Sequence, residues 1–313
     1  MQTRNLGRSG LRVSLVGLGC NNFGGKLDLA ASRKVVHKAL DLGVTLFDTA
    51  NTYGNKGASE AILGDVLGDR RKDIVLATKF GWTFDEARGL MGASRRYIMT
   101  AVEGSLQRLK TDHIDLYQLH RPDPLTPIEE TLRALDDLVR QGKVRYLGCS
   151  NMPAWQVIDA HWTAKSGGLD AFVSCQDEYS LVARGIEREL IPAMTTHGLG
   201  LLPFFPLASG LLTGKYKRGE PPAAHTRFAT RQGAGDRFGT DANFALVDKL
   251  AAFAAARGHS MLDLAFAWLA SRPLLASVMA GATSAEQVEQ NVKAVDWKLT
   301  TEDIAEIERL SGR

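Results

Sequence analysis

Four side chains that can move protons or hold charge stand where apolar runs of the sequence end. Asp48 lies near the end of one such run, and Tyr53 follows that run. Lys79 lies near the end of the next run, and His120 follows a third. An ammonium about 4 Å from a phenol favours the phenolate by about 4 kcal/mol at an effective dielectric of about 20, or about three pK units. Desolvation of the phenolate offsets part of this gain. We therefore expect Lys79 to move the pKa of Tyr53 toward neutrality.

This set of groups suits the protonation of a carbonyl oxygen that receives a hydride. Tyr53 would donate the proton, and Asp48 would keep Lys79 charged and oriented. His120 would hydrogen-bond the substrate oxygen. Taken singly, a buried Asp is often only a structural acceptor and a lysine often only lies on the surface. Together they indicate a site, because a low-dielectric interior would not hold Asp48 and Lys79 unless they were paired.

The elements that must position these side chains alternate regularly. Short apolar runs are followed by longer segments whose apolar residues recur at helical spacing, which predicts a parallel sheet with helices between its strands. Several runs are apolar throughout, as is typical of strands buried on both faces. Eight such units in 313 residues predict a (β/α)8 TIM barrel, a single α/β domain over residues 1–313, with its site at the strand-to-helix loops. The predicted strands cover 15–19, 46–50, 74–80, 114–119, 144–149, 171–175, 199–205 and 276–280.

Helical patterns fill the intervals between strands, and four features depart from the alternation. The clearest helical patterns cover 30–42, 58–67, 95–109, 128–140 and 155–164. A turn at 6–11 predicts an N-terminal β-hairpin that closes the bottom of the barrel. Residues 215–243, with several glycines and two adjacent prolines, predict a long loop after the seventh strand. Of the helical patterns at 243–256 and 261–270 one is an insertion, and 300–310 predicts an added C-terminal helix.

The composition argues against several other classes of protein. The 38 Lys and Arg against 35 Asp and Glu give a net charge of +3, which lacks the basic excess of nucleic-acid-binding proteins. No run approaches the roughly 18 consecutive apolar residues of a membrane span, and the first residues carry no secretory apolar core, so we expect a cytoplasmic protein. The widely spaced Cys20, Cys149 and Cys175 predict neither a disulfide framework nor a metal site.

The motifs around the four candidate residues resemble those of the aldo-keto reductases. The matching segments are Phe47-Asp48-Thr49-Ala50-x-x-Tyr53-Gly54, the strand that carries Lys79, and Leu119-His120-Arg121-Pro122, and the resemblance extends from Leu6 to Asn291. It implies a barrel that reduces aldehydes or ketones with NADP(H). It also implies a catalytic tetrad, in which Tyr53 is the general acid, Lys79 and Asp48 tune it, and His120 orients the substrate.

No Gly-x-Gly-x-x-Gly follows the first strand, so a Rossmann fingerprint is absent. The reductases of this family instead lay an extended NADP(H) across the barrel top. The resemblance implies that Ser150, Asn151 and Gln176 bond the nicotinamide carboxamide, that Phe204 stacks on its ring, and that Lys215 serves the pyrophosphate. The full set of implied cofactor contacts is Gly19, Cys20, Asn21, Ser150, Asn151, Gln176, Phe204, Pro206, Leu207, Ser209, Gly210, Lys215, Arg227, Gly281, Thr283, Gln287, Gln290 and Asn291.

The choice between NADP(H) and NAD(H) depends on a few of these positions. The helix start after Gly281 is suited to a phosphate, and in the family this segment holds the adenosine 2′-phosphate. Many NADP-selective members carry Arg or Lys where this chain has Gly281 or Thr283. Ser284 and Arg227 could take that role, so we favour NADP(H) and keep NAD(H) as a second option.

Other functions stay open at this point. The enzyme could run in reverse as an NAD-dependent alcohol or aldose dehydrogenase, or Lys79 could form the Schiff base of a barrel aldolase. A barrel without turnover could sense the nicotinamide redox state for a partner, as the potassium-channel β subunits are thought to. We expect a small carbonyl substrate in a pocket lined by Trp82 and Arg121. Arg121 could favour an anionic substrate or pair with a neighbouring carboxylate, and the oligomeric state is left open.

Overall fold

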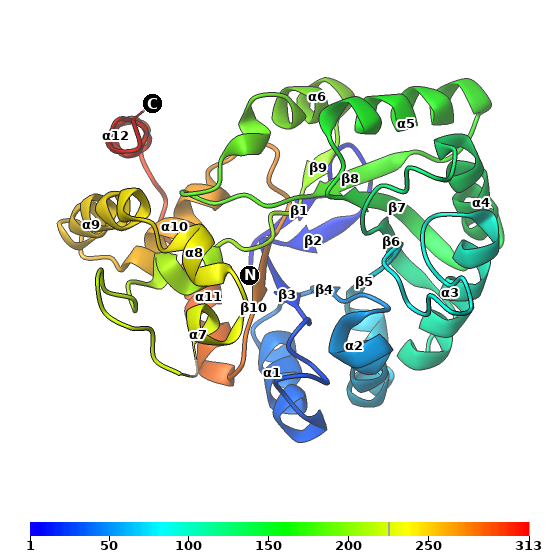
Figure 1. The fold of residues 1–313 in the computed structure, drawn as a ribbon, viewed down its shortest axis with the longest axis horizontal. Coiled ribbons are helices and arrows are strands. Elements are labelled where there is room, and N and C mark those ends of the chain that lie inside the picture. Colours follow the sequence, from blue (N-terminus) through cyan, green and yellow to red (C-terminus); the bar gives the residue numbers. More distant parts are fainter. Residues whose placement is uncertain (225, 313) are drawn as a thin grey trace.

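A curled sheet of parallel strands flanked by helices forms the frame of the molecule (Figure 1). The structure, a computed structural model, describes residues 1–224 and 226–312. In this part of the chain eight strands pair in parallel, in chain order from β3 to β9 with β10 beside β3. The strands are β3 (Val16–Gly19), β4 (Leu46–Asp48), β5 (Val75–Phe80), β6 (Ile114–Leu119), β7 (Val144–Ser150), β8 (Phe172–Gln176), β9 (Gly200–Leu201) and β10 (Val278–Gly281).

The sheet closes on itself between β9 and β10. Leu201 forms a parallel bridge with Leu275, and its N–H donates to the Leu274 carbonyl at 2.8 Å. Farther along, the Met279 N–H donates to the Pro203 carbonyl at 3.2 Å. The predicted (β/α)8 barrel is thus confirmed.

Helices follow the strands where the apolar spacing predicts them. Asp28 and Ser94 begin two of these helices, because their side chains accept hydrogen bonds from the first-turn N–H groups of Ala31 and Tyr97. The longer helices are α1 (Leu29–Asp41), α2 (Tyr53–Leu67), α3 (Arg95–Leu109), α4 (Ile128–Arg140), α5 (Ala154–Gly167), α6 (Leu190–His197), α9 (Asp241–Ala255), α10 (Met261–Ala270), α11 (Ala285–Lys293) and α12 (Thr301–Leu310). The described residues also form the short 3-10 segments η1 (Gly68–Asp73), η2 (Gly185–Glu187) and η3 (Ala208–Thr213).

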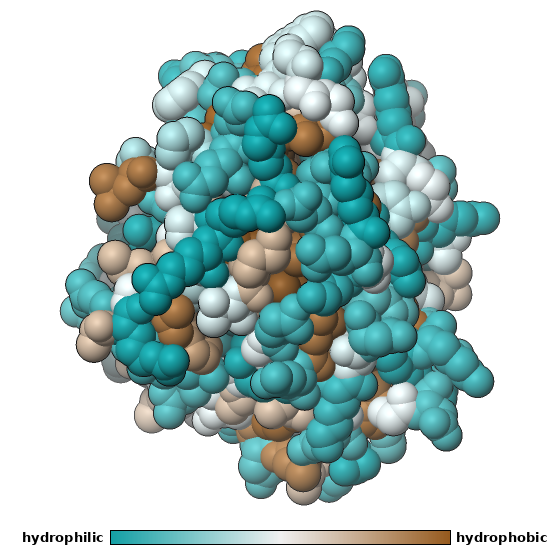
Figure 2. Space-filling view, turned by 90° about the vertical axis from the view of Figure 1, so that its right-hand side faces the viewer, coloured by the Kyte–Doolittle hydropathy of each residue, from teal (hydrophilic) through white to brown (hydrophobic). Residues whose placement is uncertain are grey.

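Several of these helices are amphipathic and present polar side chains outward. In α4, Leu132, Leu135 and Leu138 are buried, whereas Glu129 and Arg133 are exposed. The face of the molecule that includes α3 and α4 is accordingly mostly hydrophilic, with apolar side chains scattered over it (Figure 2). Within the described residues, no helix combines the length and apolarity that a membrane span requires.

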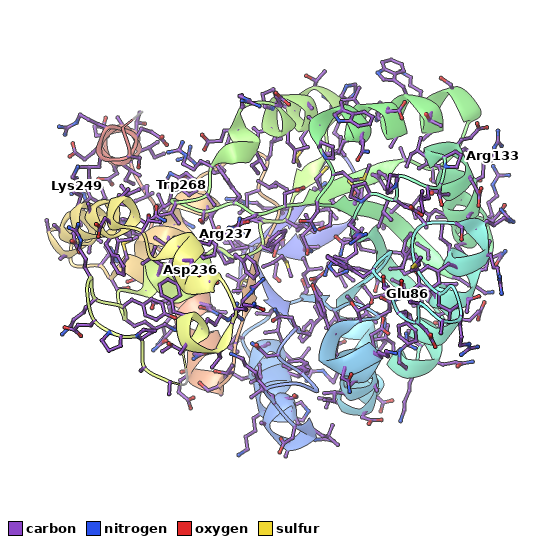
Figure 3. All side chains as sticks on the ribbon, in the orientation of Figure 1. Glu86, Arg133, Asp236, Arg237, Lys249 and Trp268 are labelled. Atoms are coloured by element: carbon purple, nitrogen blue, oxygen red, sulfur yellow. The ribbon has the colours of Figure 1, made fainter. Side chains whose placement is uncertain are left out.

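The segment predicted as one long loop, residues 215–243, is partly helical. It contains α7 (Arg227–Thr230) and α8 (Ala234–Phe238), and α9 begins at Asp241 because the Thr240 side chain caps it. Arg237 of α8, marked in Figure 3, forms an ion pair with Glu178 in the connection after β8. His225, also within that predicted loop, lies outside the described residues.

Two other predictions need adjustment. The seventh strand is shorter than the predicted run 199–205, because Pro203 has no N–H to donate and Phe205 has a left-handed φ of 51°. Of the two helices before β10, α9 is the additional one, since it packs on α10 and α12, whereas α10 contacts β10 and α11. The predicted C-terminal helix is present as α12, whose Thr300 and Asp303 form a capping box.

An N-terminal hairpin covers the bottom of the barrel, as predicted. Its strands β1 (Thr3–Asn5) and β2 (Arg12–Ser14) pair antiparallel. The Arg8 N–H in the connecting turn donates to the Gly198 carbonyl at 2.8 Å, just before β9. Leu6 and Val13, both without solvent exposure, pack with the apolar residues at the barrel interior.

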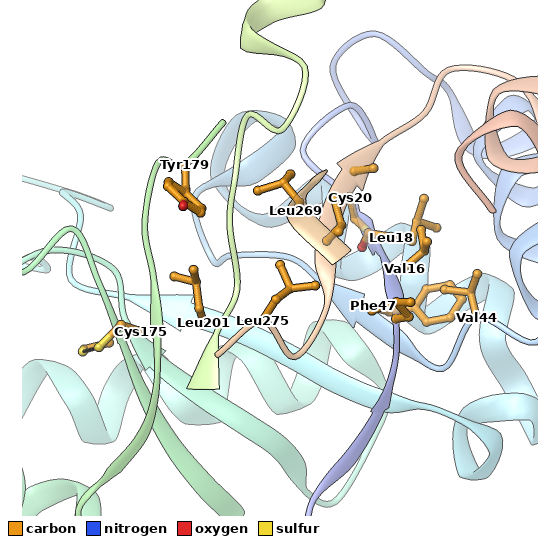
Figure 4. Close-up of a cluster of buried hydrophobic side chains, with 14 of the residues drawn as sticks. Val16, Leu18, Cys20, Val44, Phe47, Cys175, Tyr179, Leu201, Leu269 and Leu275 are labelled. Atoms are coloured by element: carbon orange, nitrogen blue, oxygen red, sulfur yellow. Dashed lines mark hydrogen bonds between the residues drawn. The ribbon is translucent and has the colours of Figure 1, made fainter. Parts of the chain in front are cut away.

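Two apolar layers hold the barrel together. One lies between strands and helices and includes Val16, Leu18 and Phe47 (Figure 4). The other is smaller and includes Leu46, Ala77 and Leu116, one from each of three neighbouring strands. Because side chains two apart on a strand share a face, the residues two positions later on these strands stack directly above this inner layer. Those residues are Asp48, Lys79 and Gln118.

The hairpin turn offers a test of this packing. Gly7 has a φ of 60°, and a Cβ added there would lie 2.5 Å from the Gly198 carbonyl oxygen and 2.6 Å from the Gly200 nitrogen. Gly7→Ala should therefore lower the free energy of unfolding by about 1–3 kcal/mol. Gly10→Ala is the matched control, because its nearest contact would be the Tyr146 hydroxyl at 3.7 Å. Equal denaturant midpoints for both variants would contradict the proposed packing.

Candidate active site

A buried ion pair lies at the carboxyl ends of β4 and β5. The Lys79 ammonium is 2.5 Å from Asp48 Oδ2 and also donates to the Thr49 carbonyl at 2.9 Å. Lys79 has no solvent exposure and Asp48 only 4%. Burial alone would lower the pKa of Lys79, but the Asp48 carboxylate and the nearby Tyr53 hydroxyl outweigh it and hold that pKa above its ordinary value. Lys79 is therefore charged at neutral pH.

Two amides from other strands hold the second oxygen of the Asp48 carboxylate. Asp48 Oδ1 accepts hydrogen bonds from Gln118 Nε2 at 2.9 Å and from Gln176 Nε2 at 3.1 Å. The Lys79–Asp48 pair is thus connected to β6 and β8 as well as to β4 and β5. Gln118 was not among the predicted site residues, although a polar residue near the end of a mostly apolar strand is a signal that could have found it.

Tyr53 lies beside this ion pair, at the start of α2. Lys79 Nζ is 5.0 Å from the centre of the Tyr53 ring. The chain turns sharply after Tyr53, because the residues from Gly54 to Gly57 all have positive φ values of 61° to 97°. At Gly54 a Cβ would lie 2.3 Å from the Phe23 carbonyl oxygen, so this position requires glycine. The strained turn fixes where the phenol points.

The expectation of a lowered Tyr53 pKa is wrong. Burial raises the pKa of Tyr53 above its ordinary value, and the opposing effect of the Lys79 ammonium does not overcome the combined effect of burial and the Asp48 carboxylate. Tyr53 is therefore protonated at neutral pH. The phenol keeps the proton that an acid must donate, and the Lys79 charge still reduces the cost of releasing it.

The His120 imidazole faces the same space and is neutral. Its ring centre lies 5.7 Å from that of Tyr53 and 5.9 Å from that of Trp82, both edge to face. Burial, the Lys79 charge and the Arg121 charge lower the pKa of His120 to about 2. His120 Nδ1 has no hydrogen-bond partner among the described residues. A neutral imidazole can donate one N–H to a bound oxygen without adding charge.

The predicted carboxamide contacts lie at the ends of β7 and β8. The Ser150 hydroxyl donates to the Gln176 carbonyl at 2.7 Å. Asn151, with a left-handed φ of 57°, donates from Nδ2 to the His120 carbonyl at 3.0 Å and to Ser150 Oγ at 3.0 Å. Asn151 is thus hydrogen-bonded to the His120 backbone, and Ser150 to the backbone of Gln176, whose side chain binds Asp48.

The loop after β9 is held in an unusual conformation beside Phe204, a partly buried ring. Ala208 and Ser209 have left-handed φ values of 45° and 58°. Ser209 Oγ is buried and without a hydrogen-bond partner among the described residues. The Lys215 side chain crosses Gly210, where an added Cβ would lie 2.6 Å from Lys215 Cε. Pro206 is buried, and the partly buried Leu207 packs against the core.

Four cations gather near this loop and lack a carboxylate. Lys26, Lys215, Arg227 and Arg231 form no ion pair within residues 1–224 and 226–312. Burial and the charges of Arg227 and Lys215 lower the pKa of Lys26, and burial followed by the Arg231 charge lowers that of Arg227. Mutual repulsion of this kind is relieved by a bound anion. Lys26 was missed in the sequence, where nothing marks a lone lysine between glycine and leucine.

The remaining predicted cofactor contacts lie around β3 and β10. An added Cβ at Gly281 would lie 3.3 Å from Asn21 Oδ1 and 3.5 Å from Arg227 Nη2, which brings these predicted residues together. Gly19 ends β3 opposite Gly281, and the buried Cys20 thiol points away from solvent. At the start of α11, the Thr283 N–H and hydroxyl donate to Gln287 Oε1 at 2.8 and 3.1 Å. Gln290 is exposed and Asn291 is buried.

The cysteines provide no metal site. Cys149 and Cys175 lie opposite each other on β7 and β8, with their sulfur atoms 3.6 Å apart, and both are buried. No group of three or more His, Cys, Asp or Glu side chains suited to a metal ion occurs in the described part of the chain.

Comparison with known proteins agrees with this geometry. The model of the aldo/keto reductase family matches residues 15–311, nearly the whole chain. The chain therefore belongs to the aldo/keto reductase family of oxidoreductases, which confirms the resemblance seen in its motifs.

Individual relatives carry different names. A probable voltage-gated potassium channel subunit beta of Oryza sativa subsp. japonica is 40% identical over 98% of this chain and 96% of its own. The uncharacterized oxidoreductase YrpG of Bacillus subtilis (strain 168) is 37% identical over 96% of this chain and 93% of its own. The L-glyceraldehyde 3-phosphate reductase of Escherichia coli (strain K12) is 34% identical over 99% of this chain and 92% of its own.

One buried acid beside the site is not part of the ion-pair network. Asp177 follows Gln176 directly, is 7% exposed, and its Oδ2 lacks a hydrogen-bond partner among the described residues. Burial raises the pKa of Asp177 to about 8, although a hydrogen bond from the Asn151 backbone opposes the shift. The folded protein therefore holds a proton that the unfolded chain releases near pH 4.

Asp177→Asn should stabilise the protein increasingly as the pH rises. Because the folded pKa of Asp177 exceeds the unfolded one, its contribution to stability is complete below about pH 4 and is lost as the pH rises through about 8. Asparagine does not titrate, so the free energy of unfolding of the variant does not fall with pH for this reason. Thermal melts between about pH 5 and 9 should show a growing difference from wild type. The exposed Asp159→Asn is the control, and a pH-independent difference for Asp177→Asn would contradict the assignment.

Proposed function

We propose that this protein is an NADP(H)-dependent reductase of aldehydes or ketones in which Tyr53 is the general acid. The observation that supports this most is the convergence of a charged, paired Lys79, a protonated Tyr53 and a neutral His120 on one space at the barrel rim. Each group is in the protonation state that carbonyl reduction needs.

The residues divide the work as follows. When bound, the nicotinamide cofactor supplies the hydride that reaches the carbonyl carbon. Tyr53 donates its hydroxyl proton to the carbonyl oxygen as negative charge develops there. Lys79 stabilises the resulting phenolate electrostatically, and Asp48 keeps the ammonium charged and fixed. His120 donates an N–H to the same oxygen and orients the substrate.

The residues around the rim fit a phosphorylated dinucleotide. The unpaired cations Lys26, Lys215 and Arg227 supply positive charge for its phosphates. The orphaned Ser209 hydroxyl can be satisfied by the same ligand. We favour NADP(H) over NAD(H) because the Arg227 guanidinium lies beside Gly281, where the sequence lacks the cation typical of NADP-selective members.

A barrel aldolase is disfavoured by the state of Lys79. A Schiff-base lysine must lose its proton to attack a carbonyl carbon. Here the ammonium is held 2.5 Å from the Asp48 carboxylate, and the pKa of Lys79 is raised rather than lowered. We therefore infer that Lys79 acts through its charge.

A second candidate function follows from the relatives named as potassium channel β subunits. In that case the barrel would bind the nicotinamide cofactor and report its redox state to a partner protein. The two candidates differ in turnover: a reductase consumes NADPH with a panel of aldehydes, whereas a pure sensor binds the cofactor tightly without measurable reduction.

Tyr53→Phe should reduce kcat by at least about 100-fold with any aldehyde substrate, because the ring remains but the donated proton is lost. Cofactor binding, followed by quenching of protein fluorescence with NADPH, should persist. Tyr146→Phe is the matched control, since Tyr146 lies near the hairpin at the barrel bottom. Undiminished turnover in Tyr53→Phe would refute the assignment of the general acid.

Arg227→Gln should raise the Kd for NADPH by about 10- to 100-fold, the loss expected when one charge-assisted phosphate contact is removed. The Kd for NADH should change little, because NADH has no 2′-phosphate. Arg218→Gln is the control in the same segment, since Arg218 already pairs with Asp241. Equal losses for the two cofactors would place Arg227 at the pyrophosphate instead.

A further inference from the structure

Arg121 lies at the mouth of the site, in contact with a ring that adjoins His120. The Arg121 guanidinium carbon is 4.5 Å from the centre of the Trp82 ring, and that ring centre is 5.9 Å from the His120 ring centre. The guanidinium and the imidazole thus both lie next to the Trp82 ring, and their separation cannot exceed the sum of these two distances. Trp82 is 42% exposed, so the two side chains border open space rather than the core.

No carboxylate neutralises Arg121 in the described part of the chain. Asp123, the nearest acid along the sequence, influences Arg121 electrostatically but forms no ion pair with it. Its oxygens are already engaged by the Ala93 N–H at 2.8 Å, the Leu125 N–H at 3.0 Å and the Thr126 hydroxyl at 2.7 Å. Pairing with a neighbouring carboxylate, one of the two alternatives left open by the sequence, is thus absent here.

The other groups around the substrate space add no net positive charge. The Lys79 ammonium is matched by the Asp48 carboxylate, and the His120 imidazole is neutral. Of the two cations that act on the imidazole, Lys79 and Arg121, only Arg121 has no paired carboxylate in the described residues. Its influence reaches His120, where the guanidinium is one of the charges that disfavour the imidazolium form.

We propose that Arg121 binds the anionic group of the substrate, so that the enzyme prefers short carbonyl compounds that carry a carboxylate or a phosphate. The proposal rests on the proposed carbonyl reduction, whose reacting oxygen would lie at His120 and Tyr53. The guanidinium fork matches either anion through two parallel hydrogen bonds, and Arg keeps its charge at all relevant pH values. The Trp82 ring restricts the guanidinium to one side through cation–π contact.

The test compares pairs of aldehydes in which one member carries an anionic group and the other does not. Initial rates are measured with glyceraldehyde 3-phosphate against glyceraldehyde, and with succinic semialdehyde against butanal. In wild type, kcat/KM should be higher for the anion of each pair. Arg121→Gln should lower kcat/KM for both anions by about 10- to 100-fold, mainly through KM, and leave the neutral aldehydes within about two-fold. Arg121→Lys should retain part of the preference, because the charge stays while the fork is lost.

Controls separate this role from a structural one. Arg96→Gln removes an exposed arginine of α3 that forms no ion pair in the described residues, and should leave every substrate unchanged. Raising the ionic strength should raise KM for the anions only, and the effect should vanish in Arg121→Gln. Equal losses for charged and neutral aldehydes in Arg121→Gln, or no loss at all, would overturn the proposal.

A failure of carbonyl reduction itself would be visible in wild type, as absence of turnover with all four aldehydes. Isothermal titration of glycerol 3-phosphate, which needs no turnover, then tests the anion site independently. Wild type saturated with NADPH should bind this anion, and Arg121→Gln should bind it at least about 10-fold more weakly. Equal affinities in the two proteins would exclude Arg121 as its ligand.

Discussion

An ammonium group without access to water must be paired, because an unpaired charge in a protein interior costs several kcal/mol. Lys79 meets this constraint through Asp48, and Asp48 in turn needs the amides of Gln118 and Gln176 to satisfy its second oxygen. The ion pair is therefore stable only if the carboxyl ends of β4, β5, β6 and β8 lie at the same level along the barrel axis. The apolar residues two positions earlier on three of these strands supply that register, and the polar cluster rests on them.

The same ion pair determines what the neighbouring groups can do. The positive charge of Lys79 disfavours the imidazolium form of His120 and favours the phenolate of Tyr53. Burial acts in the same direction on the imidazole but in the opposite direction on the phenol, so the structure keeps Tyr53 protonated. The strained turn at Gly54 then holds that phenol in place. Local backbone strain is tolerated here because residues before and after the turn, such as Ala50 and Leu63, are buried in the core.

Much of the fold could be predicted because strands buried on both faces appear as plain apolar runs. The proximity of the four candidate residues could be predicted because they stand at or near the ends of such runs. The short length of β9 could not be predicted, because the segment from Leu199 to Phe205 is apolar enough for a longer strand. The strand ends early only because of the backbone geometry at Pro203 and Phe205. The direction of the Tyr53 pKa shift could not be predicted either, because it depends on how far the folded protein excludes water from the phenol. Lys26 becomes notable only when the fold brings it near Lys215 and Arg227.

The net charge of +3 does not show where positive charge is exposed, because that depends on which charged side chains are paired. Arginines that hold elements together are matched with acids, as Arg108 is with Glu60 and Arg184 with Glu308. Arg227 and Arg121 lack such partners in the described residues, and both lie at the rim. A nearly neutral chain can therefore have a positively charged rim without a basic composition, because its acidic side chains are paired with basic side chains elsewhere in the fold. Cations that the fold leaves unpaired at the rim repel one another, and a bound anion relieves that repulsion. Such unpaired charge therefore favours the binding of an anionic ligand.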